Sequence, residues 1–194
     1  MTVDFSAKHA TLGYLYQSRY ALYLLLTSGG DDSEIAIERL DDITFEEHGE
    51  ALALLQTKHR SNASANLSNA SPDLWKTLRV WCTQTKEGLI GDSVILTLVT
   101  TSLAPADDTS IVRQIKDTVA RNNKHIASEL YNVATYSNST DLKLAFEAYR
   151  SLTEEQRISL ISRVRILDGS PDIDDISTKS KNALLISPDY RQLI

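Results

Sequence analysis

The chain has 194 residues, of which 42% are apolar and 24% charged, so it can bury a core without disulfides or metal staples. Its net charge of −6 argues against broad binding to nucleic acid, although a small basic patch could still hold phosphates. The single cysteine, Cys82, excludes an internal disulfide, and no apolar run is long enough to span a bilayer. We therefore expect a cytoplasmic protein with no membrane partner.

The first part of the chain predicts one helix followed by three strands. Residues 9–27 repeat apolar side chains at spacings of three and four, as an amphipathic helix does. Residues 34–40 alternate apolar and polar side chains as a strand does, Asp41 and Asp42 interrupt the pattern, and residues 43–47 continue as strand. A turn at residues 48–50 then leads into an apolar strand at residues 51–58.

A second helix and a buried strand are expected next. Residues 60–71 are rich in Ser, Asn and Ala without periodicity, which is typical of a mobile surface loop. Pro72 opens a helix over residues 73–88, and the apolar run at 93–102 predicts a strand inside a sheet. The order is therefore helix, three strands, helix, strand.

The second half of the chain reads as mostly helical. Helices are expected at residues 105–121, 126–134, 141–151 and 153–164. Residues 163–168 suggest a short strand, whereas residues 169–194 give no clear pattern. The last residues carry no stop signal, which leaves open that the chain continues into a longer protein.

The segment from Glu38 to Lys58 carries the most informative polar residues. Glu38 and Asp42 are expected to share one strand face, because side chains two and four residues apart do so. Gln56 and Lys58 share a face of a neighbouring strand, about 4.8 Å away. Asp42, Gln56 and Lys58 can therefore converge on one hydrated magnesium ion, which prefers oxygen ligands. This arrangement predicts metal-assisted hydrolysis of a phosphodiester.

Each of these motifs also has a commoner explanation. The acidic stretch at residues 41–50 could be a solvated hairpin, and Lys58, His59 and Arg60 could be a solvated strand end. Lys76 and Arg79 lie three residues apart on one helix face. They could hold phosphates, or simply belong to the solvent-exposed face of an amphipathic helix. The order and spacing of the motifs together favour a functional site.

Four segments carry a resemblance to a known family: GYLYQSRYALYLLL at 13–26, IERLDD at 37–42, LLQTKH at 54–59 and DLWKTLRVW at 73–81. Over its first half the chain resembles the PD-(D/E)xK nuclease superfamily. It is most similar to the nuclease domain of CD-NTase-associated double-stranded DNA endonucleases of bacterial anti-phage defence. The resemblance implies an α/β fold, with a restriction-endonuclease-like αβββαβ core at residues 1–104 and a mostly helical extension at 105–194.

The resemblance also implies a role for each matching residue. Asp42 matches the metal-binding acid, with Asp41 as the alternative because Leu40-Asp41-Asp42 stands in place of Pro-Asp. Gln56 replaces the second acid, as in the Mrr-like branch, and Lys58 matches the catalytic lysine. Gln17 stands where many members place a first-helix acid, and a glutamine there is a weaker ligand. Glu38 is expected to support Asp42.

The expected activity is that of a Mg²⁺- or Mn²⁺-dependent endonuclease that cuts duplex DNA with low sequence specificity. His59, Arg60, Lys76 and Arg79 are expected to contact the DNA. The resemblance further implies phage defence, and activation by a sensor domain, a partner subunit or homo-oligomerisation. Two alternatives stay open: an inactive nuclease fold that serves as a DNA-binding or assembly module, and an interaction protein without nuclease chemistry.

Overall fold

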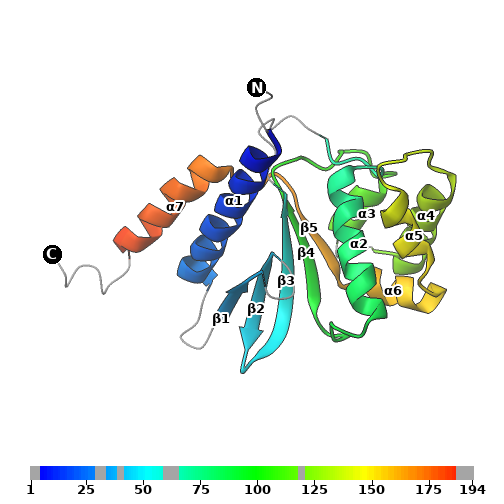
Figure 1. Cartoon of the computed structure of the whole chain (residues 1–194), viewed down its shortest axis with the longest axis horizontal. Coiled ribbons are helices and arrows are strands. Elements are labelled where there is room, and N and C mark those ends of the chain that lie inside the picture. The colour runs from blue at the N-terminus through cyan, green and yellow to red at the C-terminus, as the bar shows by residue number, and fades with distance from the viewer. Residues whose placement is uncertain (1–4, 29–33, 39–41, 59–65, 118–120, 187–194) are drawn as a thin grey trace.

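One mixed β-sheet organises the chain (Figure 1). The computed structural model describes residues 5–28, 34–38, 42–58, 66–117 and 121–186. The strands follow the order β1-β2-β3-β4-β5 across the sheet. Strands β1 (Glu34–Ile37), β2 (Ile43–Glu47) and β3 (Glu50–Lys58) are antiparallel neighbours. Strands β4 (Ile95–Thr100) and β5 (Val164–Leu167) continue the sheet parallel to β3.

Helices precede, connect and follow these strands. Helix α1 (Phe5–Ser28) precedes β1, α2 (Pro72–Lys86) connects β3 to β4, and α7 (Ile173–Ile186) follows β5. The connection from β4 to β5 contains α3 (Ile111–Lys116), α4 (Asn123–Tyr136), α5 (Lys143–Arg150) and α6 (Glu154–Arg163). The α/β class and the predicted order of helix, three strands, helix and strand are confirmed. The short strand expected near residue 164 is also present, and it extends the sheet as β5.

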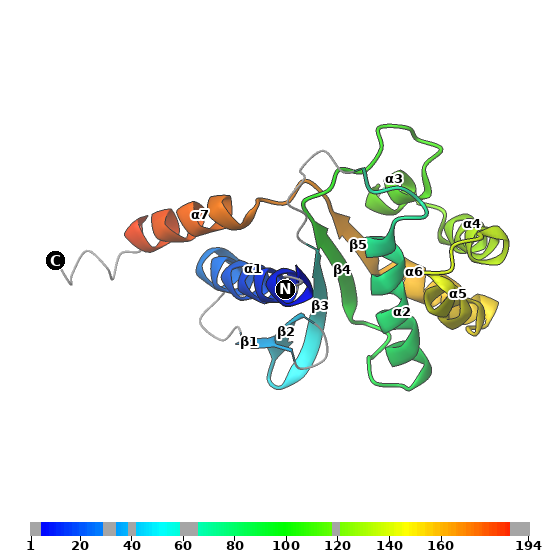
Figure 2. The same ribbon diagram turned by 45° about the horizontal axis from the view of Figure 1, so that its top comes forward.

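The two faces of the sheet carry separate apolar clusters. Because successive side chains of a strand point to opposite faces, Leu54 joins the larger cluster and Leu55 the smaller one. The larger cluster packs strand side chains against α2–α6, with Trp75, Trp81 and Tyr149 among its fully buried residues. The smaller cluster packs them against α1. Figure 2 shows α1 and α7 on one side of the sheet and α2–α6 on the other.

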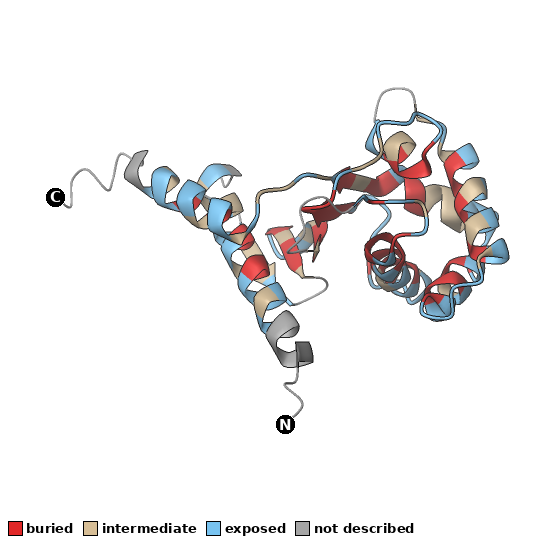
Figure 3. Cartoon of the chain, turned by 90° about the horizontal axis from the view of Figure 1, so that it is seen from above, coloured by how far each residue is buried: buried red, intermediate tan, exposed pale blue. Residues whose placement is uncertain are grey.

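Helix α7 is attached to the protein through α1. The Tyr16 hydroxyl donates to the Pro171 carbonyl at 3.0 Å, and Arg19 donates to the Ser177 hydroxyl at 2.8 Å. Ile176 is fully buried in the cluster that α1 makes with the sheet. Seen from above, α7 runs along α1 and away from the strands (Figure 3). None of the helices in the described ranges is long and apolar enough to cross a bilayer.

The structure corrects two expectations about the first half of the chain. The expectation that one strand runs through from Glu38 to Asp42 is wrong, because Glu38 has a φ of 61° and β1 and β2 are antiparallel. Ile37 then pairs with Ile43 across the hairpin. Residues 66–71 of the surface loop expected at 60–71 do form a loop, with Asn66, Ser68 and Ala70 exposed, but its Leu67 is fully buried in the core. Residues 59–65 lie outside the described ranges.

Candidate functional site

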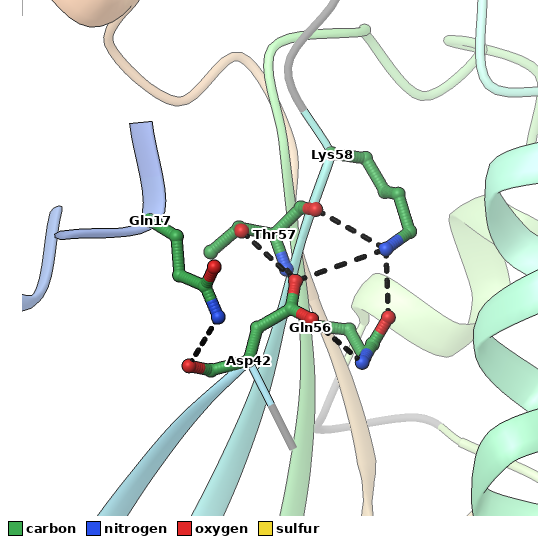
Figure 4. Close-up of polar contacts among 5 residues, drawn as sticks. All are labelled: Gln17, Asp42, Gln56, Thr57 and Lys58. Atoms are coloured by element: carbon green, nitrogen blue, oxygen red, sulfur yellow. Dashed lines mark hydrogen bonds and ion pairs between the residues drawn. The ribbon is translucent and has the colours of Figure 1, made fainter. Parts of the chain in front are cut away.

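The candidate site lies where β2 begins and β3 ends (Figure 4). Ile43 pairs with Leu55 in the antiparallel ladder, so Asp42, one residue earlier, faces Gln56. Lys58 ends β3 next to Thr100, its partner in the parallel ladder with β4. Ligands of open α/β sheets bind at the carboxyl ends of parallel strands, and the site is at that edge.

Three donors from β3 hold the carboxylate of Asp42. Gln56 donates its Nε2–H to Asp42 Oδ1 at 3.1 Å. Thr57 donates to Oδ2 twice, from its amide nitrogen at 2.8 Å and from its hydroxyl at 3.0 Å. The Asp42 side chain is 23% exposed, so one part of the carboxylate group still reaches solvent. Charge-assisted bonds of this kind are among the stronger hydrogen bonds in proteins.

The Lys58 ammonium completes the cluster. It donates to Gln56 Oε1 at 2.7 Å and to the Thr57 carbonyl at 3.2 Å, and it lies 3.8 Å from Asp42 Oδ2. The structure therefore brings Asp42, Gln56 and Lys58 together, at one end of two neighbouring strands. The Gln56 amide sits between the acid and the ammonium and bonds to both.

Gln17 reaches the same residue from the other side of the sheet. Its side chain is almost fully buried, and its Nε2–H donates to the main-chain carbonyl of Asp42. The Gln17 amide is therefore engaged with the backbone of residue 42 and not with the Asp42 carboxylate. Gln17 therefore fixes the backbone of residue 42 against α1, while β3 fixes its side chain.

Glu38 is placed differently from the expectation. Its backbone amide donates to the Asp42 carbonyl at 3.2 Å across the turn, but its side chain is exposed. Within the described ranges, the Glu38 carboxylate makes no hydrogen bond or ion pair. The expectation that Glu38 and Asp42 share a face of one continuous strand is wrong, because the chain reverses between them.

The residues expected to contact DNA are only partly described. Lys76 and Arg79 lie on the exposed side of α2, whose other side packs into the larger core cluster. His59, Arg60 and the alternative acid Asp41 lie outside the described residues.

Thr57 is the site residue that the sequence did not single out. Its position between Gln56 and Lys58 in the sequence placed it near the site. Strand alternation, however, predicts that its side chain points to the face of the sheet opposite to theirs. One of its two contacts uses the backbone amide, which no side-chain pattern reveals.

The donor set suits a hard cation better than a soft one. In the ranges given above, no group of three or more His, Cys, Asp or Glu side chains could hold a metal ion. The site instead offers one carboxylate, one amide oxygen and one main-chain carbonyl, all directed at the Lys58 ammonium. Such oxygens are the ligands that a hydrated Mg²⁺ or Mn²⁺ ion prefers, whereas most zinc sites are built from Cys and His.

No protein-family model and no curated protein matches this chain. The chemistry of the site therefore rests on its geometry: a carboxylate held by three hydrogen bonds, a bridging amide and a partly exposed ammonium.

Proposed function

We propose that this chain is a restriction-endonuclease-like nuclease that hydrolyses phosphodiester bonds of duplex DNA, with low sequence specificity and with Mg²⁺ or Mn²⁺. The observation that carries the proposal is the cluster of Asp42, Gln56 and Lys58 at the carboxyl end of β3. The order α1-β1-β2-β3-α2-β4 supports it, because the PD-(D/E)xK core that the sequence resembles has the same order.

Each residue of the cluster has a separate task in this proposal. Asp42, Gln56 and the Thr57 carbonyl would hold the divalent ion, which when bound supplies charge neutralisation and a more acidic water. Lys58 places a positive charge on a flexible stem beside the scissile phosphate, where charge develops during cleavage. Gln17 and Thr57 keep Asp42 in one orientation, so little reorganisation is needed when substrate arrives.

Basic residues on the α2 side would dock the DNA backbone. Gln56 and Lys58 lie two and four residues after Leu54 on the same strand, so their side chains share its face, the one that α2 covers. Lys76 and Arg79 are exposed on α2, and together with His59 and Arg60 they would contact phosphates. We further propose a cytoplasmic role in phage defence, with cutting switched on by a sensor domain, a partner subunit or homo-oligomerisation.

Cleavage of supercoiled plasmid tests the proposal. The wild-type protein should nick and linearise the plasmid with Mg²⁺ and stop when EDTA is added. Asp42→Asn and Lys58→Ala should each lower the rate by about a hundredfold or more, as loss of a charge that stabilises the transition state does. Lys86→Ala, at the far end of α2, is the matched control and should cleave normally. Equal rates for the wild type and Lys58→Ala contradict the mechanism.

One observation favours a second candidate, an inactive nuclease fold that binds DNA or assembles proteins. The described part of the site holds a single carboxylate, and Gln56 occupies the position of the usual second acid. A gel-shift experiment with a short duplex separates the two. Binding that is lost in Lys76→Ala and Arg79→Ala, without any cleavage in Mg²⁺ or Mn²⁺, would support the second candidate.

A further inference from the structure

Lys58 occupies the position in the site that is best suited to a cation. Its ammonium nitrogen lies 2.7 Å from Gln56 Oε1, 3.2 Å from the Thr57 carbonyl oxygen and 3.8 Å from Asp42 Oδ2. These three atoms are also the oxygens that a divalent ion would use. The ammonium and the ion would therefore share one set of ligands.

The oxygens around the ammonium are held by other contacts. Asp42 Oδ2 accepts two hydrogen bonds from Thr57, and the Thr57 carbonyl belongs to the backbone of β3. The Gln56 amide is tied to Asp42 through its nitrogen, which directs its oxygen at Lys58. Lys58 is the member of the cluster that can move, because its charge sits at the end of a flexible four-carbon stem and its side chain is 24% exposed.

We propose that Lys58 is the resident counter-cation of this site, and that a divalent ion binds only by displacing its ammonium. The inference rests on the proposed function only for the identity of the ion. Mg²⁺ requires oxygen ligands at about 2.0–2.1 Å, closer than any oxygen lies to the ammonium. Two positive charges that share one carboxylate also repel each other, so the ammonium opposes the binding of an ion to these oxygens.

Displacement gives the site an order of events. When the ammonium leaves, Gln56 Oε1 no longer accepts a hydrogen bond from Lys58, and the same oxygen can face the ion. The released ammonium can then pair with an anion that enters beside the ion, such as a phosphate. Binding of the ion and release of the Lys58 ammonium are therefore one coupled step. The ion and the ammonium each lower the affinity of the three oxygens for the other.

Calorimetric titration of the whole chain with MnCl₂, without DNA, tests the competition. Lys58→Met removes the competing charge while keeping a side chain of similar length, and we expect about tenfold tighter Mn²⁺ binding, the effect of losing one nearby like charge. Lys86→Met is the control and should bind Mn²⁺ as the wild type does. Unchanged or weaker binding by Lys58→Met, with a thermal unfolding curve like that of the wild type, would overturn the proposal.

Amine acylation of the wild-type protein gives a second readout that needs no variant. Mass spectrometry would follow the acylation rates of Lys58 and Lys86 with and without MnCl₂. We expect Mn²⁺ to raise the Lys58 rate several-fold and to leave the Lys86 rate unchanged. A Lys58 rate that stays constant or falls as Mn²⁺ is added overturns the proposal.

The two proposals fail in different ways. A wild type that never cleaves DNA, together with tighter Mn²⁺ binding by Lys58→Met, supports the counter-cation and contradicts the nuclease. Plasmid cleavage by the wild type, together with equal Mn²⁺ affinities for the wild type and Lys58→Met, supports the nuclease and contradicts the counter-cation.

Discussion

Thr57 donates two hydrogen bonds to the same oxygen of Asp42, from its amide at 2.8 Å and from its hydroxyl at 3.0 Å. The pair fixes the rotation of the carboxylate and leaves Oδ1 to Gln56. Only the hydroxyl bond depends on the side chain, so its contribution can be separated from that of the backbone.

Thr57→Val removes the hydroxyl bond and keeps the size of a side chain that is 8% exposed. A hydrogen bond to a charged group contributes about 1.5–3 kcal/mol, so we expect plasmid cleavage to slow by tenfold or more. Thr57→Ser keeps the hydroxyl and should retain most of the rate. Equal rates for Thr57→Val and Thr57→Ser would mean that the orientation of Asp42 does not limit cleavage.

Substitutions of Gln17 distinguish a positioning residue from a metal ligand. Gln17→Leu removes the donor to the Asp42 carbonyl and should lower the free energy of unfolding by about 1–3 kcal/mol, as loss of a buried hydrogen bond does. Gln17→Glu places an acceptor against that carbonyl and should destabilise the protein at least as much. Urea unfolding measures both. Tighter Mn²⁺ binding by Gln17→Glu, without loss of stability, would instead identify position 17 as a ligand.

Gln56→Glu should strengthen the cation site by adding a second carboxylate next to Asp42. Because ligand charge tunes the affinity of oxygen sites, we expect Mn²⁺ to bind on the order of tenfold more tightly. Calorimetry on the wild type, Gln56→Glu and the half-buried control Gln156→Glu on α6 would measure the change. The expectation fails if Gln56→Glu and the wild type bind the ion equally.

Asp168 gives the fold a dependence on pH. Burial alone would raise the pKa of its carboxyl. The carboxylate, however, accepts hydrogen bonds from Lys116 at 2.6 Å and from the Ala104 amide at 2.9 Å. These bonds and the positive charge of Lys116 hold the pKa of Asp168 below its ordinary value of 3.8. A carboxyl group whose pKa is lower in the folded than in the unfolded state stabilises the fold at pH values above its pKa in the unfolded state. That stability is lost as the pH falls through the folded value.

Asp168→Asn should therefore lower the free energy of unfolding at pH 7 by about 1–3 kcal/mol. It should also reduce the loss of stability between about pH 5 and pH 3, since the titrating group is gone. Urea unfolding across this pH range is the measurement. Asp108→Asn is the control, because Asp108 is almost fully exposed and its ion pair with Arg113 should contribute little.

The sequence predicted the parts of the site that depend on regular strands. Gln56 and Lys58 share a face because strand alternation is strict, and Asp42 faces Gln56 because the hairpin register is set by apolar pairs such as Ile43 with Leu55. The position of Glu38 was not predictable in this way. It depends on one left-handed backbone conformation, which the alternating pattern of residues 34–40 does not show.

The last helix was missed for a different reason. Ile173, Ile176 and Ser180 have helical spacing, but the surface that covers them belongs to α1, more than 140 residues earlier in the chain. Isolated helices of this length are marginal, so local pattern alone gives a weak signal. Contacts between distant segments, such as Tyr16 with Pro171, complete the helix pair.

The two attachments of Asp42 make the site sensitive to the placement of α1. Its carbonyl is tied to Gln17 on that helix and its carboxylate to Thr57 on β3, so sliding of α1 over the sheet would twist residue 42 between the two anchors. A molecule that binds the outer surface of α1 would thereby change the orientation of Asp42 from a distance, without touching the site itself.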